Sequence, residues 1–221
     1  MKKEIVKTTD GSYTLYVPEL DETYHSTNGA LQESLHVFID AGLKFSSLKK
    51  VSVLEVGFGT GLNALTTFNE AEKQGISIEF TSLEAYPLTW EEVDKLNYLA
   101  LEGYEKHSIP FKEMHSCDWG RFTEISSNYS LRKMNLKLQE LTFENTFDLI
   151  YFDAFAPQIQ PELWTEEIFA LMYKALKNKG VLVTYCAKGT VKRALKAVGF
   201  ELQSIPGPPG KREMSRAVKN N

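Results

Sequence analysis

Three closely spaced glycines after a short apolar segment form the first candidate binding loop. The segment reads VLEVGFGTGLN, with the glycines at Gly57, Gly59 and Gly61. Because glycine has no Cβ, the backbone can turn sharply there and approach a ligand at the carboxyl end of a strand. The same pattern also suits a tight strand-to-helix connection that binds nothing. The loop therefore indicates a nucleotide-type cleft without naming its occupant.

Acidic residues follow at the ends of the next two segments that we predict to be strands. Glu84 ends TSLEA, 23 residues after Gly61, where a carboxylate could accept hydrogen bonds from both hydroxyls of a ribose. Asp118 ends HSCDW, where it could accept from an amino group while Trp119 covers an adenine face. Either acid alone could instead cap a helix. Together, one at each successive strand end, they favour an adenosine site.

The glycine spacing and one nearby charge distinguish among adenosine cofactors. Dinucleotides favour G-x-G-x-x-G, which brings the pyrophosphate to a helix N-terminus, whereas this loop reads G-x-G-x-G. Glu55 stands two residues before Gly57, where a carboxylate would repel a pyrophosphate and attract a sulfonium or an α-ammonium group. The pattern points to S-adenosyl-L-methionine and disfavours a nicotinamide-dependent oxidoreductase.

Another acid follows the fourth predicted strand, in DLIYFDAFAP. Asp153 emerges there from an apolar run, with Phe155 and Pro157 just beyond it. Such an acid either caps the following loop or faces the reaction centre, and we favour the second at this strand end. Tyr24 precedes the first predicted helix and could close over the pocket, although the region could equally be an ordinary helix N-terminus. The histidines show no metal-ligand spacing, so we expect no metal site.

Alternating short apolar runs and helical patterns predict an α/β fold with a mostly parallel sheet. A hairpin around Asp10-Gly11 and a helix from Ala30 to about Gly42 come first, and we assign 1–45 to an N-terminal extension and 46–221 to the main domain. The expected strands are Val51–Val56, Ile76–Leu83, Phe111–Ser116, Phe147–Phe152 and Val181–Cys186, with an inserted strand or hairpin in Leu131–Leu141 and a closing hairpin of Glu201–Ile205 and Glu213–Val218. The expected helices are Leu62–Lys73, Thr89–Leu101, Pro161–Leu176 and Val191–Val198.

The charge is unevenly distributed along the 221 residues. Residues 174–221 hold 11 Lys and Arg against 2 acids, whereas residues 1–173 hold 14 against 27. The basic tail, including Lys211 and Arg212, could contact nucleic-acid phosphates, or it could be an ordinary solvated face. With two cysteines and neither a signal core nor an apolar run long enough to span a bilayer, we expect a cytoplasmic protein.

Four motifs together resemble one family. EVGFGTGLNALT, SLEAYPLT, FDAFAP followed by PELWT, and GKREM look like the methyltransferase domain of MnmC in its standalone form, over about residues 13–218. The resemblance implies a class I methyltransferase fold with a seven-stranded sheet that ends in an antiparallel hairpin. The cofactor-binding residues would be Glu55, Gly57, Gly59, Gly61, Asn63, Glu84, Asp118 and Trp119.

The same resemblance implies a reaction. Family members methylate the amine of 5-aminomethyl(-2-thio)uridine at the wobble position of tRNA, and Asp153 would face that amine. From residue type and position, and not from the resemblance, we expect the tRNA to contact Tyr24, Phe155, Pro157, Lys211 and Arg212. Bifunctional members also carry a flavin-dependent oxidase that makes the aminomethyl group from a carboxymethylaminomethyl precursor. We find no counterpart of that oxidase in this sequence and expect methyl transfer alone.

Two other classes of function stay open at this point. An aminopropyltransferase or a methyltransferase for small amines would share the fold and the acid after the fourth strand, but the stretch 153–160 supplies few carboxylates for a polyamine. A non-catalytic RNA-binding module would bind tRNA without binding the methyl donor. The sequence does not indicate an oligomeric state.

Overall fold

The chain opens with a small antiparallel sheet, as the sequence predicts. A computed structural model describes residues 2–220; Met1 and Asn221, the ends of the two expected domains, lie outside the described part. Strands β1 (Glu4–Lys7) and β2 (Tyr13–Val17) pair across the turn at Asp10-Gly11, where Gly11 has a φ of 86°. A two-residue strand, β3 (Glu22–Thr23), adds to β2. The predicted hairpin is thus confirmed, with one strand more.

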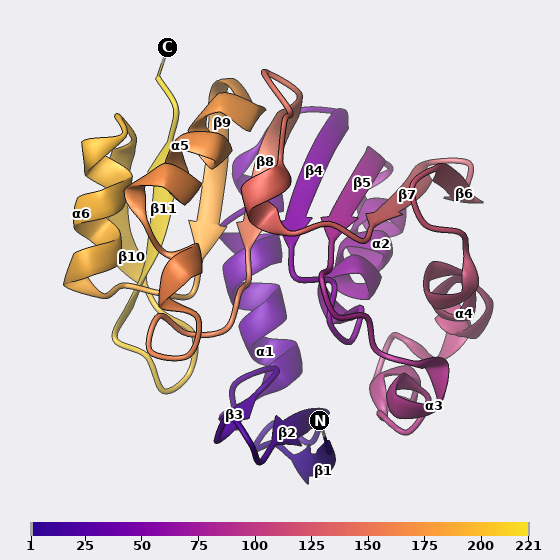
Figure 1. Ribbon diagram of the computed structural model, residues 1–221. Coiled ribbons are helices and arrows are strands. Elements are labelled where there is room, and N and C mark those ends of the chain that lie inside the picture. The colour runs from indigo at the N-terminus through magenta and orange to yellow at the C-terminus, as the bar shows by residue number, and fades with distance from the viewer. Residues whose placement is uncertain (1, 221) are drawn as a thin grey trace.

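The main sheet has eight strands in the order β10-β11-β9-β8-β4-β5-β7-β6. The five central strands, from β9 to β7, run parallel, while β11 pairs antiparallel with both β9 and β10. In Figure 1 the parallel strands end on the side of the molecule where β1, β2 and β3 lie. The strands are β4 (Lys50–Val56), β5 (Ser77–Leu83), β6 (Phe122–Ser126), β7 (Tyr129–Met134), β8 (Phe147–Phe152), β9 (Leu176–Thr184), β10 (Glu201–Pro206) and β11 (Glu213–Val218).

Helices cover both faces of this sheet (Figure 1). One face packs against α1 (Ala30–Ser34), its π-helical continuation Leu35–Asp40, and α2 (Leu62–Gln74), and the other against α5 (Glu166–Ala175) and α6 (Gly189–Ala197). The remaining helices are α3 (Trp90–Val93) and α4 (Ser108–Ser116), with 3-10 turns at Leu43–Phe45, Tyr98–Ala100, Glu105–His107, Leu138–Glu140 and Pro161–Leu163. Because Val37, Phe38 and Ile39 are fully buried in the main core, the extension packs as part of it.

The third predicted strand is wrong. Residues 111–116 belong to α4, whose buried side chains Phe111 and Met114 are three positions apart, the spacing of one helix face. The third parallel strand is instead β7, in which Tyr129, Leu131 and Lys133 are buried and alternate with more exposed residues. The preceding β6 pairs antiparallel with β7 and adds an eighth strand to the seven expected.

Three other predicted elements differ in extent. The segment 89–101 forms only the short helix α3 and a 3-10 turn, and Leu138 lies in another 3-10 turn rather than in a strand. Helix α5 begins at Glu166 because Thr165 caps it, its hydroxyl oxygen accepting a hydrogen bond from the backbone N–H of Ile168 at 3.4 Å. The C-terminal hairpin of β10 and β11 is confirmed.

Candidate active site

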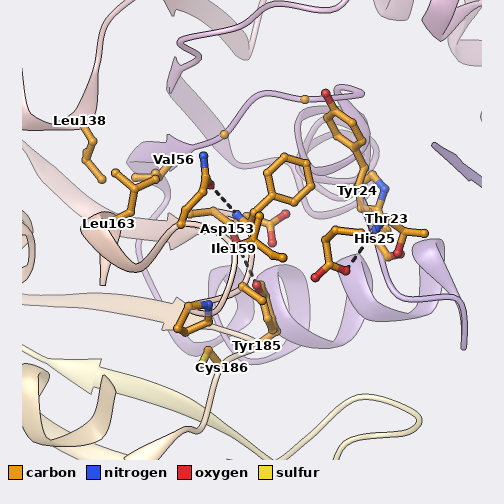
Figure 2. Close-up of a pocket in the computed structure, with 18 of the residues that line it drawn as sticks. Thr23, Tyr24, His25, Val56, Leu138, Asp153, Ile159, Leu163, Tyr185 and Cys186 are labelled. Carbon is orange, nitrogen blue, oxygen red and sulfur yellow. Dashed lines mark hydrogen bonds between the residues drawn. The ribbon is translucent and has the colours of Figure 1, made fainter. Parts of the chain in front are cut away.

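A cavity of about 1360 Å³ lies where the central strands end. Its wall consists of the segments that follow β4, β5, β7, β8 and β9, together with the turn between β10 and β11 and residues of the N-terminal extension. Figure 2 shows Asp153 in the middle of this wall, with Tyr24 and His25 on one side and Leu138 and Leu163 on the other. The cavity exceeds the roughly 300–1,000 Å³ of a typical small-molecule site, so it has room for two ligand groups.

The first two glycines of the loop face this cavity and the third does not. Gly57 has a φ of 92°, and a Cβ there would lie 2.9 Å from the backbone oxygen of Asp153. Gly59 has a φ of 49° and lies against the ring of Tyr24. Gly61 caps α2, and its Cβ would meet His115 at 2.6 Å, so it serves the packing behind the loop. Without Cβ atoms the loop packs closely against Asp153, Tyr24 and His115, and its backbone at Gly57 and Gly59 borders the cavity.

Glu84 links the glycine loop to the segment after β5 and does not cap a helix. Its carboxylate accepts hydrogen bonds from the backbone N–H of Gly59 at 2.9 Å and of Tyr86 at 2.8 Å. It therefore ties the glycine loop to the end of β5. Glu84 also lines the cavity, and a carboxylate has about four acceptor positions, so two stay available for hydroxyl groups of a ligand.

Glu55 lies behind the loop rather than on the cavity wall. It is fully buried in β4, and one carboxylate oxygen accepts a hydrogen bond from Ser82 at 2.5 Å. Among residues 2–220 the other oxygen, Oε1, has no hydrogen-bond partner. Burial raises the pKa of Glu55 well above its ordinary value, and the nearby Asp153 adds to this effect. The expected carboxylate charge beside the glycines is thus suppressed in this state.

Asp118 and Trp119 do not reach the cavity. They follow α4 instead of a strand, and Asp118 forms an ion pair with Arg121 at the surface. Trp119 is 36% exposed and packs against the ammonium group of Lys133. The segment that follows the true third strand, residues 136–140, lines the cavity in their place. The sequence analysis did not assign this segment to the cavity. The available signal was the alternation of apolar Tyr129 and Leu131 with polar Ser130 and Arg132, which is typical of a strand.

Asp153 is held by a chain of side chains that begins in the N-terminal extension. The Ser34 hydroxyl donates to the amide oxygen of Asn63 at 2.7 Å, and the Asn63 amide nitrogen donates to Asp153 at 2.8 Å. Burial raises the pKa of Asp153 to about 7, and the negative charge of Glu33 contributes, while the Asn63 hydrogen bond and Lys211 oppose this rise. Asp153 can therefore gain or lose a proton near neutral pH. Asn63, which we expected to bind the cofactor, instead donates a hydrogen bond to Asp153.

Two aromatic rings flank the cavity beside Asp153. Tyr24 and Phe155 meet edge to face, with ring centroids 5.1 Å apart. The backbone of Phe155 is fixed by two side chains that the sequence did not single out, because Gln160 accepts from its N–H at 3.1 Å and the Trp164 indole donates to its carbonyl at 2.8 Å. Tyr24, Phe155 and Pro157 all line the cavity. This wall can hold a flat ring.

The histidine next to Tyr24 is structural and uncharged. Burial lowers the pKa of His25 to about 4. Its ring nitrogens lie 3.3 Å from the Thr14 hydroxyl and 3.5 Å from the Thr60 hydroxyl in the glycine loop. His25 therefore connects the extension to the loop, and its ring stays neutral near pH 7.

Lys211 and Arg212 have different environments. Lys211 is part of the cavity wall, where its ammonium group pairs with Glu33 at 2.5 Å and lies 3.9 Å from the ring centre of Tyr185. Arg212 is exposed on the rim. Several other cations of the tail are also neutralised, in the pairs Lys174–Glu144, Lys177–Asp148 and Lys192–Glu213. The surface charge of the tail is thus smaller than its composition suggests.

Comparisons with known proteins bear on this site. Residues 113–220 match a family model described as S-adenosyl-L-methionine-dependent methyltransferase. The matched segment, just under half of the chain, has the sequence of an S-adenosyl-L-methionine-dependent methyltransferase. This methyltransferase is 31% identical, over 91% of its length, to the tRNA 5-methylaminomethyl-2-thiouridine biosynthesis bifunctional protein MnmC of Cupriavidus necator, and 30% identical, over 89%, to that of Actinobacillus pleuropneumoniae. It spans only 32% of the length of either relative.

Solved structures agree with the family. The crystal structure of MnmC2 from Aquifex aeolicus superposes with a TM-score of 0.81 at 28% identity, covering all of this methyltransferase and 71% of that chain. Spermidine synthase from Thermotoga maritima, with a TM-score of 0.57 at 17% identity, covers 98% of this chain and 68% of that one and shows a shared fold alone. The class I methyltransferase fold and the resemblance to the MnmC methyltransferase domain are confirmed.

The cavity of this methyltransferase fits the cofactor of the family, S-adenosyl-L-methionine. Gly57 and Gly59 present bare backbone to the cavity, which a ligand can approach closely, and Glu84 offers acceptor positions for ribose hydroxyls. Among residues 2–220, no helix is long and apolar enough to cross a membrane.

Proposed function

We propose that this methyltransferase transfers a methyl group to the primary amine of 5-aminomethyl(-2-thio)uridine at the wobble position of tRNA. The observation that carries the proposal is the position of Asp153, which faces a large cavity between a glycine loop and two aromatic rings. The similarity to proteins that make 5-methylaminomethyl-2-thiouridine in tRNA supports the choice of acceptor. Such an enzyme would act in the cytoplasm.

The cofactor would lie against the glycine loop. Gly57 and Gly59 would leave room for it, Glu84 would accept from its ribose hydroxyls, and Asn63 would act indirectly by orienting Asp153. When bound, S-adenosyl-L-methionine supplies an electrophilic methyl group on a sulfonium. Displacement at that carbon requires the amine lone pair about 3 Å away and in line with the bond that breaks. The protein's main contribution is therefore positioning.

The acceptor must lose a proton before it can react. A primary alkylamine has a pKa near 10.4, so about one molecule in 10³ is neutral at pH 7. Because burial and Glu33 raise the pKa of Asp153 to about 7, this carboxylate can accept a proton from the ammonium group and still be about half ionised at neutral pH. Asp153 would orient the amine by a hydrogen bond and take up its proton.

The aromatic wall and the tail would hold the tRNA. A wobble base turned out of its stack would pack against the wall that Tyr24 and Phe155 form together, with Pro157 extending the apolar surface. Arg212 on the rim is placed to meet a phosphate near that base, while Lys211 is held inside the wall.

The decisive experiment is methyl transfer to defined substrates. Undermodified tRNA that carries 5-aminomethyluridine is incubated with the protein and S-adenosyl-L-methionine, and the wobble nucleosides are analysed by mass spectrometry. We expect a mass increase of one methyl group on that nucleoside. Polyamines and bulk protein serve as competing acceptors, and methylation of these without methylation of the tRNA would refute the proposal.

A further inference from the structure

Two charged side chains and one aromatic ring form the wall next to Asp153. Glu33, which is 8% exposed, uses one carboxylate oxygen to accept from the backbone N–H of Ser26 at 2.9 Å and the other to bind the Lys211 ammonium group at 2.5 Å. Lys211 also lies over the ring of Tyr185, 3.9 Å from its centre. The pair thus joins the N-terminal extension to the turn between β10 and β11.

Glu33 and Asp153 belong to one charge environment. Both line the cavity, and the residue after Glu33, Ser34, reaches Asp153 through a single side chain, Asn63. On the other side, the Tyr185 hydroxyl donates to the carbonyl of Ala154, the residue after Asp153, at 2.9 Å. Lys211 therefore has Glu33 as its ionic partner in the part of the wall that also holds Asp153.

The charges on this wall do not cancel. Glu33 and Asp153 contribute two negative charges when ionised and Lys211 one positive charge, so these three groups together carry a net charge of −1. A cationic amine is attracted to such a wall. A carboxylate close to the amine would be repelled by both acids, and the ammonium group of Lys211 is already paired with Glu33.

We infer that Glu33 is a specificity-determining residue that makes the site accept a simple primary amine and reject an amine that carries a carboxylate. It does so in two ways: it adds a negative charge beside Asp153, and it occupies the ammonium group of Lys211, which would otherwise receive the carboxylate. The inference rests on the proposed function, and it concerns the chemistry of the group attached to the acceptor nitrogen.

The test compares two tRNA substrates that differ only in this group. One carries 5-aminomethyluridine and the other its N-carboxymethyl derivative, and the measured quantity is the ratio of their kcat/KM values. In Glu33→Gln the amide keeps an acceptor for Ser26 and frees Lys211, so we expect the preference for the simple amine to fall about tenfold or more. Glu140→Gln, which neutralises another acid of the cavity wall, should leave the ratio unchanged.

Two further variants separate charge from loss of structure. In Lys211→Met the unpaired Glu33 makes the wall more negative, so the preference for the simple amine should rise. In the double variant Glu33→Gln/Lys211→Met no freed cation can receive the carboxylate, and the gain seen with Glu33→Gln should disappear. A general loosening of the wall would instead admit the larger amine in all three variants.

The outcomes distinguish the inference from the proposed function. If the wild-type protein methylates the simple amine and Glu33→Gln keeps its preference within twofold, the inference is wrong while the proposed function stands. An unchanged preference in Lys211→Met overturns the inference in the same way, even if Glu33→Gln does not fold. If the wild-type protein methylates neither tRNA, the proposed function itself fails.

Discussion

Replacing Asp153 by asparagine should stabilise the protein and inactivate it at the same time. The pKa of Asp153 in the folded chain is about 7, against an ordinary value of 3.8. A carboxyl group with a raised pKa favours folding fully below its unfolded pKa, and this contribution is lost as the pH rises through the folded pKa. Above pH 7 the folded protein must therefore hold a carboxylate that its surroundings disfavour.

The size of the effect follows from the same two values. A difference of about three pH units corresponds to a ceiling of about 4 kcal/mol, at about 1.36 kcal/mol per unit. Because the carboxylate faces a cavity that water can enter, we expect about half of that ceiling. Asp153→Asn keeps an acceptor for Asn63 and has no charge to bury, so at pH 8 it should unfold about 4–8 °C above the wild type. At pH 4 the two melting temperatures should be similar.

Activity should change in the opposite direction. Asparagine cannot take a proton from the amine, and loss of general-base catalysis typically costs a factor of about 10²–10⁴. In the wild type, kcat/KM for methyl transfer should increase with pH and level off near pH 7, as Asp153 ionises. Binding of S-adenosyl-L-methionine, measured by calorimetry, should change little.

Melting curves at pH 4 and pH 8 and initial methylation rates from pH 5.5 to 8.5 check both expectations. Asp153→Ser serves as a control because it also removes the charge but loses the shape of the carboxyl group. A variant that is no more stable at pH 8 than the wild type would show that Asp153 is not a disfavoured carboxylate. Turnover within fivefold of the wild type would remove it from the proton transfer.

Three other substitutions test separate parts of the site. Gly57→Ala places a Cβ 2.9 Å from a backbone oxygen at a φ of 92°, so we expect the free energy of unfolding to fall by about 1–3 kcal/mol. The rise in melting temperature on adding S-adenosyl-L-methionine should also be smaller than in the wild type. His25→Asn should leave the position of the pH–rate profile unchanged, because the pKa of His25 is about 4; a moved profile would assign the proton to His25. Arg212→Glu should weaken tRNA binding and reduce its salt dependence by about one phosphate contact. Lys174→Glu, at a cation already paired with Glu144, should do neither. Equal filter-binding curves for both variants would show that Arg212 on the cavity rim does not contact the tRNA.

The glycine loop and the acids at the ends of β5 and β8 could be predicted because they depend on local patterns. An apolar strand, a turn that needs positive φ and a helix follow each other within about 20 residues, and the parallel topology then brings the strand ends together. Glu84 and Asp153 reach the same cavity for this reason. No knowledge of distant contacts is needed for such residues.

The third strand could not be placed in the same way. FKEMHS contains two apolar residues three positions apart. In so short a segment this spacing is compatible with a helix and with an irregular strand. The position of the third strand is decided by which segment pairs with β5. That segment is β7, and the pairs run from Ile78–Tyr129 to Leu83–Met134. That pairing is a tertiary property, and the misplacement of Asp118 and Trp119 follows from it.

The active site depends on the N-terminal extension as well as on the main sheet. Ser34 orients Asn63 across 29 positions of the chain, and Glu33 binds Lys211 across 178. Such pairs leave no periodic signal in the sequence. They nevertheless hold Asn63 in its hydrogen bond to Asp153 and keep Lys211 paired on the same wall. A main domain without residues 1–45 would keep the glycine loop but lose the hydrogen-bond chain to Asp153 and leave Lys211 without its partner. We therefore infer that the docked extension shapes the cavity wall around Asp153.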